Sequence, residues 1–108
     1  MNIAGFLHIP DSRYCFAESD HELTIRLRVA KEDANLPISL VFGNKYHYQF
    51  EREEKKLSVR YIDHTHAYFE VTLKLSDVRL AYIFKIQDQG KTYYFSEDGI
   101  TEDFDFSV

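Results

Sequence analysis

Apolar and polar residues alternate in the stretch Leu23-Thr24-Ile25-Arg26-Leu27-Arg28-Val29. Successive side chains of a strand point to opposite faces of its sheet, so this spacing predicts a strand with one face in the core and the other in water. The alternation recurs in four more rows of apolar residues: Ile38, Leu40 and Phe42; Leu57, Val59 and Tyr61; Phe69, Val71, Leu73 and Leu75; and Leu80, Tyr82, Phe84 and Ile86. Each row predicts another half-buried strand.

Turn residues separate these rows. Asp88, Gln89 and Gly90 stand before Tyr93 and Phe95 and predict a hairpin turn. Residues 3–9 and 13–18 supply two more candidate strands. Short strands separated by turns about every 8 to 12 residues are typical of two packed antiparallel sheets. We therefore predict an all-β chain, an antiparallel β-sandwich of about eight strands that forms a single domain over residues 1–108.

Two stretches depart from the alternation. Residues 51–56 read Glu-Arg-Glu-Glu-Lys-Lys, and such a charged run is typical of a solvated loop. From Glu97 onward the chain becomes acidic, with Ile100, Phe104 and Phe106 between the carboxylates. This last stretch fits either an edge strand or a linker.

Composition excludes several classes of partner. A chain of 108 residues with 44% hydrophobic and 29% charged residues fits one soluble domain. Its net charge of -5 gives no attraction to phosphate backbones, so we expect no nucleic-acid partner. No segment approaches the ~20 apolar residues of a membrane span, and residues 1–9 do not resemble a signal peptide. With Cys15 as the sole cysteine, no internal disulfide can form, and we expect a cytoplasmic protein.

The residues that carry chemistry are few. No Gly-x-Ser-x-Gly elbow and no glycine-rich phosphate loop occurs, so we predict no catalytic residue and no nucleotide site. Asp63, His64 and His66 could in principle hold a transition metal. Because a third ligand is not evident, a polar turn between two strands is the favoured interpretation. We predict no metal site and no cofactor.

Aromatic residues alternate in the segment Tyr46-His47-Tyr48-Gln49-Phe50. Rings near a loop can lie flat against the apolar face of a sugar, while neighbouring polar groups bond the hydroxyls. The same rings could instead pack in the core. Phe50 fits the core better, whereas both interpretations stay open for Tyr46 and Tyr48, because tyrosine is often only partly buried.

Six segments in order resemble one family. They are Leu7-His8-Ile9-Pro10 with Ser12, Tyr14 and Phe16; Leu23 to Arg28; Val41-Phe42-Gly43-Asn44-Lys45-Tyr46; Tyr68-Phe69-Glu70-Val71; Arg79 to Phe84; and Tyr94-Phe95-Ser96-Glu97-Asp98-Gly99. Together they are similar to the N-terminal domain of cyclomaltodextrinases, neopullulanases and maltogenic amylases, of the α-amylase family. The resemblance implies an immunoglobulin-like β-sandwich of the carbohydrate-binding module type, followed in the same polypeptide by a catalytic (β/α)8 barrel.

The resemblance implies that the catalytic residues belong to the barrel and not to residues 1–108. In the family, the barrel carries the two carboxyl groups that hydrolyse α-glycosidic bonds with retention, and its substrates are maltodextrins and cyclodextrins. The N-terminal module supports a homodimer and narrows the partner's substrate cleft. Tyr46 matches a family tyrosine at the rim of that cleft, and Tyr48 is a second candidate for sugar contact. The alternative is a stand-alone β-sandwich that binds a glycan or a protein, and the length of the gene beyond Val108 distinguishes the two.

Overall fold

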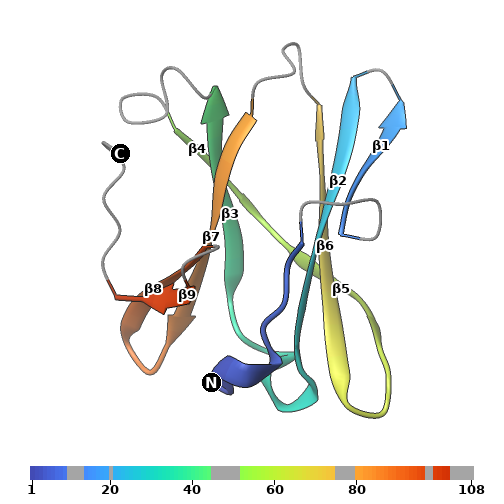
Figure 1. The fold of residues 1–108 in the computed structure, drawn as a ribbon. Helices are drawn as coiled ribbons and strands as arrows, with labels where there is room; N and C mark the ends of the chain where they lie inside the picture. Colours follow the sequence, from blue (N-terminus) through green and yellow to red (C-terminus); the bar gives the residue numbers. More distant parts are fainter. Residues whose placement is uncertain (10–13, 20, 45–51, 75–79, 97–98, 103–108) are drawn as a thin grey trace. The chain divides into compact units, whose positions relative to one another are not determined.

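The computed structural model describes residues 1–9, 14–19, 21–44, 52–74, 80–96 and 99–102. These residues form nine strands and two short 3₁₀ helices. The elements are η1 (Ile3–Gly5), β1 (Cys15–Ser19), β2 (Glu22–Ala30), η2 (Lys31–Asp33), β3 (Ile38–Asn44), β4 (Glu53–Lys56), β5 (Ser58–Ile62), β6 (His66–Lys74), β7 (Leu80–Asp88), β8 (Lys91–Ser96) and β9 (Gly99–Thr101). The strands make two antiparallel sheets, one in each of two compact units (Figure 1).

The first unit, Met1–Asn35 with Leu57–Ser76, holds a sheet in the order β1-β2-β6-β5. β2 and β6 pair along their whole length, from Glu22 opposite Lys74 to Ala30 opposite His66. This register turns the apolar rows of both strands to the same face. The residues buried on that face are Ile25, Leu27, Val29, Ala67, Phe69, Val71 and Leu73. The alternation in these two stretches is therefore confirmed as far as Leu73; Leu75 lies outside the described residues.

The N-terminal segment is not the strand that residues 3–9 predict. Ile3–Gly5 forms η1, and Leu7 exchanges two hydrogen bonds with Arg28 of β2 at 2.9 and 3.0 Å. Gly5 is buried against the end of β2, where a Cβ would lie 2.5 Å from the backbone nitrogen of Ala30. A close approach of two backbones takes the place of regular pairing here, and an apolar alternation does not reveal such a contact.

The second unit, Leu36–Lys56 with Asp77–Val108, holds a sheet in the order β4-β3-β7-β8-β9. Ile38, Leu40, Phe84 and Ile86 are buried and lie in register on one face, as their alternation predicts. Val41 and Ile83 pair on the opposite face and are buried as well. The prediction of a half-buried strand is therefore incomplete for β7. It lies between β3 and β8, and apolar side chains are buried on both of its faces.

The charged run is a strand and not a loop. Glu53–Lys56 forms β4, whose four side chains are all exposed, and it pairs with residues 39–42 of β3. Lys85 of β7 reaches over to Glu54, with Nζ and Oε1 3.0 Å apart. The prediction of solvation was correct and that of a loop was wrong, because an edge strand can be held by backbone pairing alone. At the acidic end, Gly99–Thr101 forms the edge strand β9, and residues 97–98 and 103–108 lie outside the described residues.

The predicted hairpin between β7 and β8 is confirmed. Asp88 pairs with Lys91, and the two residues between them have positive φ, 51° at Gln89 and 79° at Gly90. Two successive residues of positive φ are the hallmark of the tight turn whose twist matches that of antiparallel strands. The turn therefore sets the register of β8 against β7.

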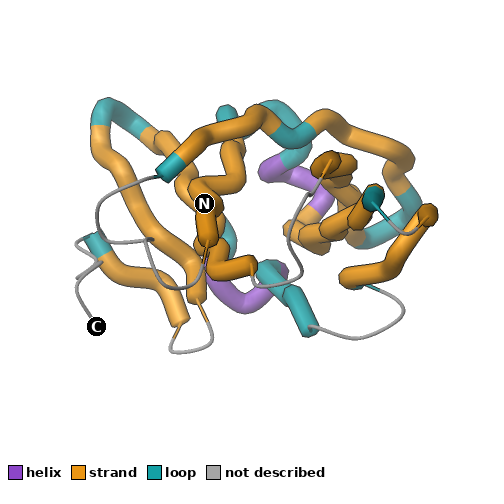
Figure 2. The backbone as a smooth tube through the Cα atoms, turned by 90° about the horizontal axis from the view of Figure 1, so that it is seen from above, coloured by secondary structure: helices purple, strands orange, loops and turns teal. Residues whose placement is uncertain are grey.

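The predicted all-β, antiparallel fold class is confirmed, with nine strands among the described residues in place of about eight. The 3₁₀ helices η1 and η2, drawn in purple in Figure 2, supply the helical structure of the described part of the chain. Within that part, no helix is long and apolar enough to span a membrane.

Candidate functional site

The two tyrosines predicted to contact sugar, Tyr46 and Tyr48, lie outside the described residues. They fall between Asn44, the last residue of β3, and Glu53, the first residue of β4. Antiparallel pairing of Phe42 with Glu53 brings the ends of these strands together. The segment that carries both tyrosines therefore joins two neighbouring strands of the second unit, and its role stays a prediction.

The candidate metal ligands form a polar turn between β5 and β6. Asp63 Oδ1 accepts hydrogen bonds from the backbone nitrogens of Thr65 (2.9 Å) and His66 (2.7 Å). The backbone nitrogen of Asp63 donates to the carbonyl oxygen of His66 at 2.9 Å, and Lys31 donates to that of Thr65 at 3.0 Å. The favoured interpretation as a turn is thus confirmed. The described residues contain no group of three or more His, Cys, Asp or Glu side chains that could hold a metal.

An aromatic cluster next to this turn was missed by the alternation. The row Leu57, Val59 and Tyr61 predicts three inward side chains, yet only Leu57 is buried, and Val59 and Tyr61 are 39% and 47% exposed. A bulge in β5 explains the position of Tyr61: Val59 pairs with Phe69 on the inner face, whereas Tyr61 pairs with Tyr68, so Arg60 is an extra residue. An extra residue reverses which face the following side chains occupy. Tyr61 consequently lies on the outer face, beside Tyr68.

The rings of Tyr61 and Tyr68 are stacked, with centroids 4.5 Å apart and an interplanar angle of 19°. The hydroxyl of Tyr68 donates a hydrogen bond to Oδ2 of Asp63 at 3.3 Å. Asp63 is the second residue after Tyr61 and lies at the end of β5. Two rings and one carboxylate thus converge at the rim of the first sheet, in a group we call the Tyr61 cluster.

Asp63 and Tyr68 are held in their neutral-pH forms by shifted pKa values. The backbone N–H groups of Thr65, and then of His66, lower the pKa of Asp63 by stabilising its carboxylate. Partial burial raises the pKa of Tyr68, and the nearby charge of Asp63 raises it further. At neutral pH the cluster therefore presents a charged acceptor whose orientation is fixed by the turn and by a protonated phenol.

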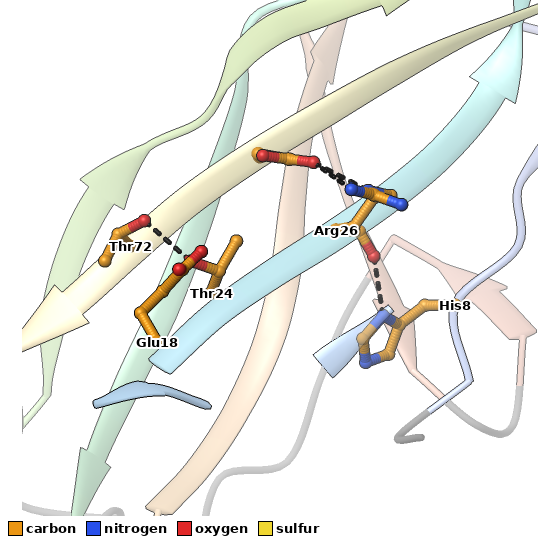
Figure 3. Close-up of polar contacts among 6 residues, drawn as sticks. His8, Glu18, Thr24, Arg26 and Thr72 are labelled. Atoms are coloured by element: carbon orange, nitrogen blue, oxygen red, sulfur yellow. Dashed lines mark hydrogen bonds and ion pairs between the residues drawn. The ribbon is translucent and has the colours of Figure 1, made fainter. Parts of the chain in front are cut away.

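Other polar groups on this face bond to one another. The guanidinium of Arg26 lies 5.4 Å from the centroid of the Phe16 ring and pairs with Glu70 at 2.6 Å. The carbonyl oxygen of Arg26 accepts from Nδ1 of His8 at 2.8 Å (Figure 3). These contacts join four segments of the chain, the N-terminal segment, β1, β2 and β6, so the residues hold the sheet together and do not form a ligand site.

Thr24 and Thr72 lie opposite each other on the same outer face of the first sheet. Thr24 is buried, and its hydroxyl donates to Glu18 at 3.1 Å and lies 2.8 Å from the hydroxyl of Thr72 (Figure 3). A hydroxyl has one proton, so Thr72 donates to Thr24 in this chain of bonds. The arrangement links β1, β2 and β6.

The second unit has a surface hollow at the tight turn. It measures about 460 Å³ and is lined by Leu36, Pro37 and residues 87–92. The backbone nitrogen of Gln87 donates to the carbonyl oxygen of Pro37 at 3.1 Å and closes one side. No aromatic ring lines the hollow, and its polar groups belong to a solvated turn, so the Tyr61 cluster is the better candidate for a binding site.

A family model ties the chain to a known group of domains. The model described as alpha amylase, N-terminal ig-like domain, matches residues 1–106. The chain belongs to this family. The predicted immunoglobulin-like fold class is therefore confirmed for this α-amylase N-terminal domain, since the match spans every described strand. A search of curated protein sequences finds no match.

Solved structures share the fold of the domain. A cyclomaltodextrinase is 19% identical, with a TM-score of 0.86 over 95% of this chain. A maltogenic amylase from S. marinus is 19% identical, with a TM-score of 0.72 over 94% of this chain. The α-amylase N-terminal domain spans 18% of the first protein's chain and 13% of the second's. It is similar to a small part of two much longer proteins.

Proposed function

We propose that this domain is the non-catalytic N-terminal module of a glycoside hydrolase that cleaves α-glycosidic bonds in short maltodextrins and cyclodextrins. The family match over residues 1–106 is the observation that carries the proposal. The two similar solved structures, a cyclomaltodextrinase and a maltogenic amylase, support the same class of enzyme. The catalytic groups, a nucleophilic carboxylate and a carboxylic acid acting with retention, belong to a (β/α)8 barrel in the same polypeptide.

Within that enzyme, the module supports a homodimer and narrows the substrate cleft. Tyr46 and Tyr48 lie at the rim of the partner's cleft, where their rings contact the sugar. Four exposed large apolar side chains of the described residues support an interface, because all of them lie in the first unit: Ile3, Ile9, Val59 and Ile62. The enzyme works in the cytoplasm, in keeping with a single cysteine in residues 1–108, which excludes a disulfide within the domain.

The test compares the full gene product with a variant that lacks residues 1–108. We expect the deletion to lower kcat/KM for β-cyclodextrin and maltotriose more than for starch, and to shift the mass measured by light scattering from dimer to monomer. Circular dichroism of the deletion variant controls for folding of the remaining chain. An intact gene product that hydrolyses none of the three substrates would refute the proposal.

A second comparison isolates the predicted rim. Tyr46→Ala in the full gene product removes the ring, whereas Tyr46→Phe keeps it and serves as the matched control. We expect only Tyr46→Ala to lower kcat/KM for cyclic and short substrates, because ring contact and not the hydroxyl selects them. An equal loss on starch would contradict the rim role of Tyr46.

A further inference from the structure

We propose that the Tyr61 cluster is a binding site for one pyranose ring of an oligosaccharide, separate from the segment that contains Tyr46 and Tyr48. Tyr61 supplies a flat apolar surface, and Asp63 supplies an acceptor for sugar hydroxyls. That the oligosaccharide is an α-glucan rests on the proposed function; the site itself rests on the geometry of the first unit.

The Tyr61 side chain is 47% exposed although one face of its ring is covered. That face is stacked on Tyr68, and Tyr68 has Arg28 of β2 directly opposite on its other side. β5 is the edge of its sheet, so no further strand of this sheet pairs beside Tyr61. We infer that the face of the Tyr61 ring opposite Tyr68 supplies the surface for a ligand. Stacking on Tyr68 already orders the Tyr61 ring, so the ring loses little conformational entropy when a ligand binds.

The carboxylate of Asp63 lies at the rim of these rings. Its Oδ1 is occupied by two backbone N–H groups, whereas Oδ2 accepts from the hydroxyl of Tyr68 alone among the described residues. A carboxylate oxygen has two acceptor sites, so Oδ2 keeps one for a ligand hydroxyl. Hydrogen bonds to a charged acceptor are about twice as strong as neutral ones. A ring face beside such an acceptor matches a pyranose, which has apolar C–H faces and hydroxyls around its edge.

Other occupants fit the cluster less well. A second strand would need a regular row of free backbone groups, and the bulge at Arg60 interrupts that row in β5. A metal ion would need more ligands than Asp63 offers, since no suitable group of three occurs in the described part of the chain. The apolar residues of β5 that could contact a protein, Val59 and Ile62, pair with Phe69 and Ala67 and so belong to the other face.

The test titrates the 108-residue chain, labelled with ¹³C in its tyrosine rings, with maltotriose and cellotriose while ring resonances are followed by NMR. We expect the Tyr61 resonances to shift saturably, with a Kd of about 1 mM for a site of one ring and one carboxylate. Tyr61→Ala weakens binding by about tenfold or more, and Tyr61→Phe stays within about twofold because the stacking face is kept. Val59→Ala is the matched control, because it removes an exposed apolar side chain from the other face of the same strand.

The outcomes separate the site from the proposed function. No saturable shift at about 20 mM of either sugar, or shifts that survive Tyr61→Ala, would overturn the inference and leave the proposed enzyme untouched. Binding of cellotriose but not maltotriose would support the site and count against an α-glucan ligand. Tyr61 resonances that move with protein concentration alone would show that a second copy of the chain covers the ring, which would also overturn the inference.

Discussion

Replacing Gly5 by alanine should destabilise the protein for a steric reason. An added Cβ would lie 2.5 Å from the backbone nitrogen of Ala30, 2.8 Å from its Cβ and 3.0 Å from its Cα. Carbon atoms in van der Waals contact stay about 3.5–4.0 Å apart, so the added Cβ would overlap both carbons by about half an ångström or more, and it would lie closer still to the nitrogen. Two of these atoms are backbone and cannot rotate away. Either η1 or the end of β2 must therefore move.

The expected cost is at the upper end of the range for overpacking, about 3 kcal/mol. For a domain of roughly 100 residues, this corresponds to a fall in Tm of about 12 °C. Thermal unfolding followed by circular dichroism, together with urea unfolding, measures both quantities. The matched control is Ala4→Ser in the same turn, because Ala4 is exposed and its replacement should change stability by no more than about 0.5 kcal/mol.

A double variant tests whether the contact with Ala30 is the cause. Ala30→Gly removes the Cβ at 2.8 Å but leaves the nitrogen at 2.5 Å, so Gly5→Ala with Ala30→Gly should recover only part of the loss. Full recovery would show that the side chain of Ala30, and not its backbone, limits the approach. A fall of less than about 0.5 kcal/mol in Gly5→Ala alone would refute the reasoning, since it would mean that η1 moves freely away from β2.

Three further changes probe the sheet of the first unit. Leu27→Ala, at a fully buried position, should cost about 2–5 kcal/mol by urea unfolding, and a smaller loss would place Leu27 outside the core. Thr24→Val removes the acceptor of Thr72 and the donor to Glu18, so it should lower the free energy of unfolding by about 1–3 kcal/mol. The double variant Thr24→Val with Thr72→Val should recover part of this loss, because it no longer leaves the hydroxyl of Thr72 without its acceptor. No recovery would contradict the bond between the two threonines. Asp63 has a pKa below its ordinary value of 3.8 in the folded protein, so its carboxylate adds stability above that pH and loses it as the pH falls through the lowered pKa. The stability difference between the protein and Asp63→Asn should therefore be constant near neutral pH and shrink in acid, and a difference that grows in acid would contradict the assigned contacts of Asp63.

The central strands were predictable because burial dictates their sequence. β2 and β6 each have a strand on both sides and one face in the core, so only apolar residues at every second position satisfy them, as at Ile25, Leu27 and Phe69. The tight turn after β7 was predictable because glycine is favoured where φ is positive, as at Gly90. Burial and positive φ each restrict a position to a few residue types, so the sequence indicates these features.

Edge strands and the N-terminal segment do not restrict their residue types in this way. β4 keeps four charged side chains in water and is held by backbone bonds to β3, which any residue except proline can make, so its sequence resembles a loop. The N-terminal segment is set by the fit of Gly5 against Ala30, and a glycine in the sequence does not say which backbone approaches it. Tertiary contacts decide both cases.

The Tyr61 cluster depends on the bulge in β5, a feature that has no residue signature. In a strand without a bulge, Arg60 would pair with Tyr68. Tyr61 would then lie on the same face as Val59, Phe69 and Ala67, as the alternation predicts. With the bulge, the tyrosine moves to the outer face and lies two residues before Asp63, whose turn is readable from the sequence. The turn and the ring are thus predictable separately, and the bulge is what brings them together. A site at a sheet edge can therefore arise from the register of the backbone, with side chains that each look ordinary in the sequence.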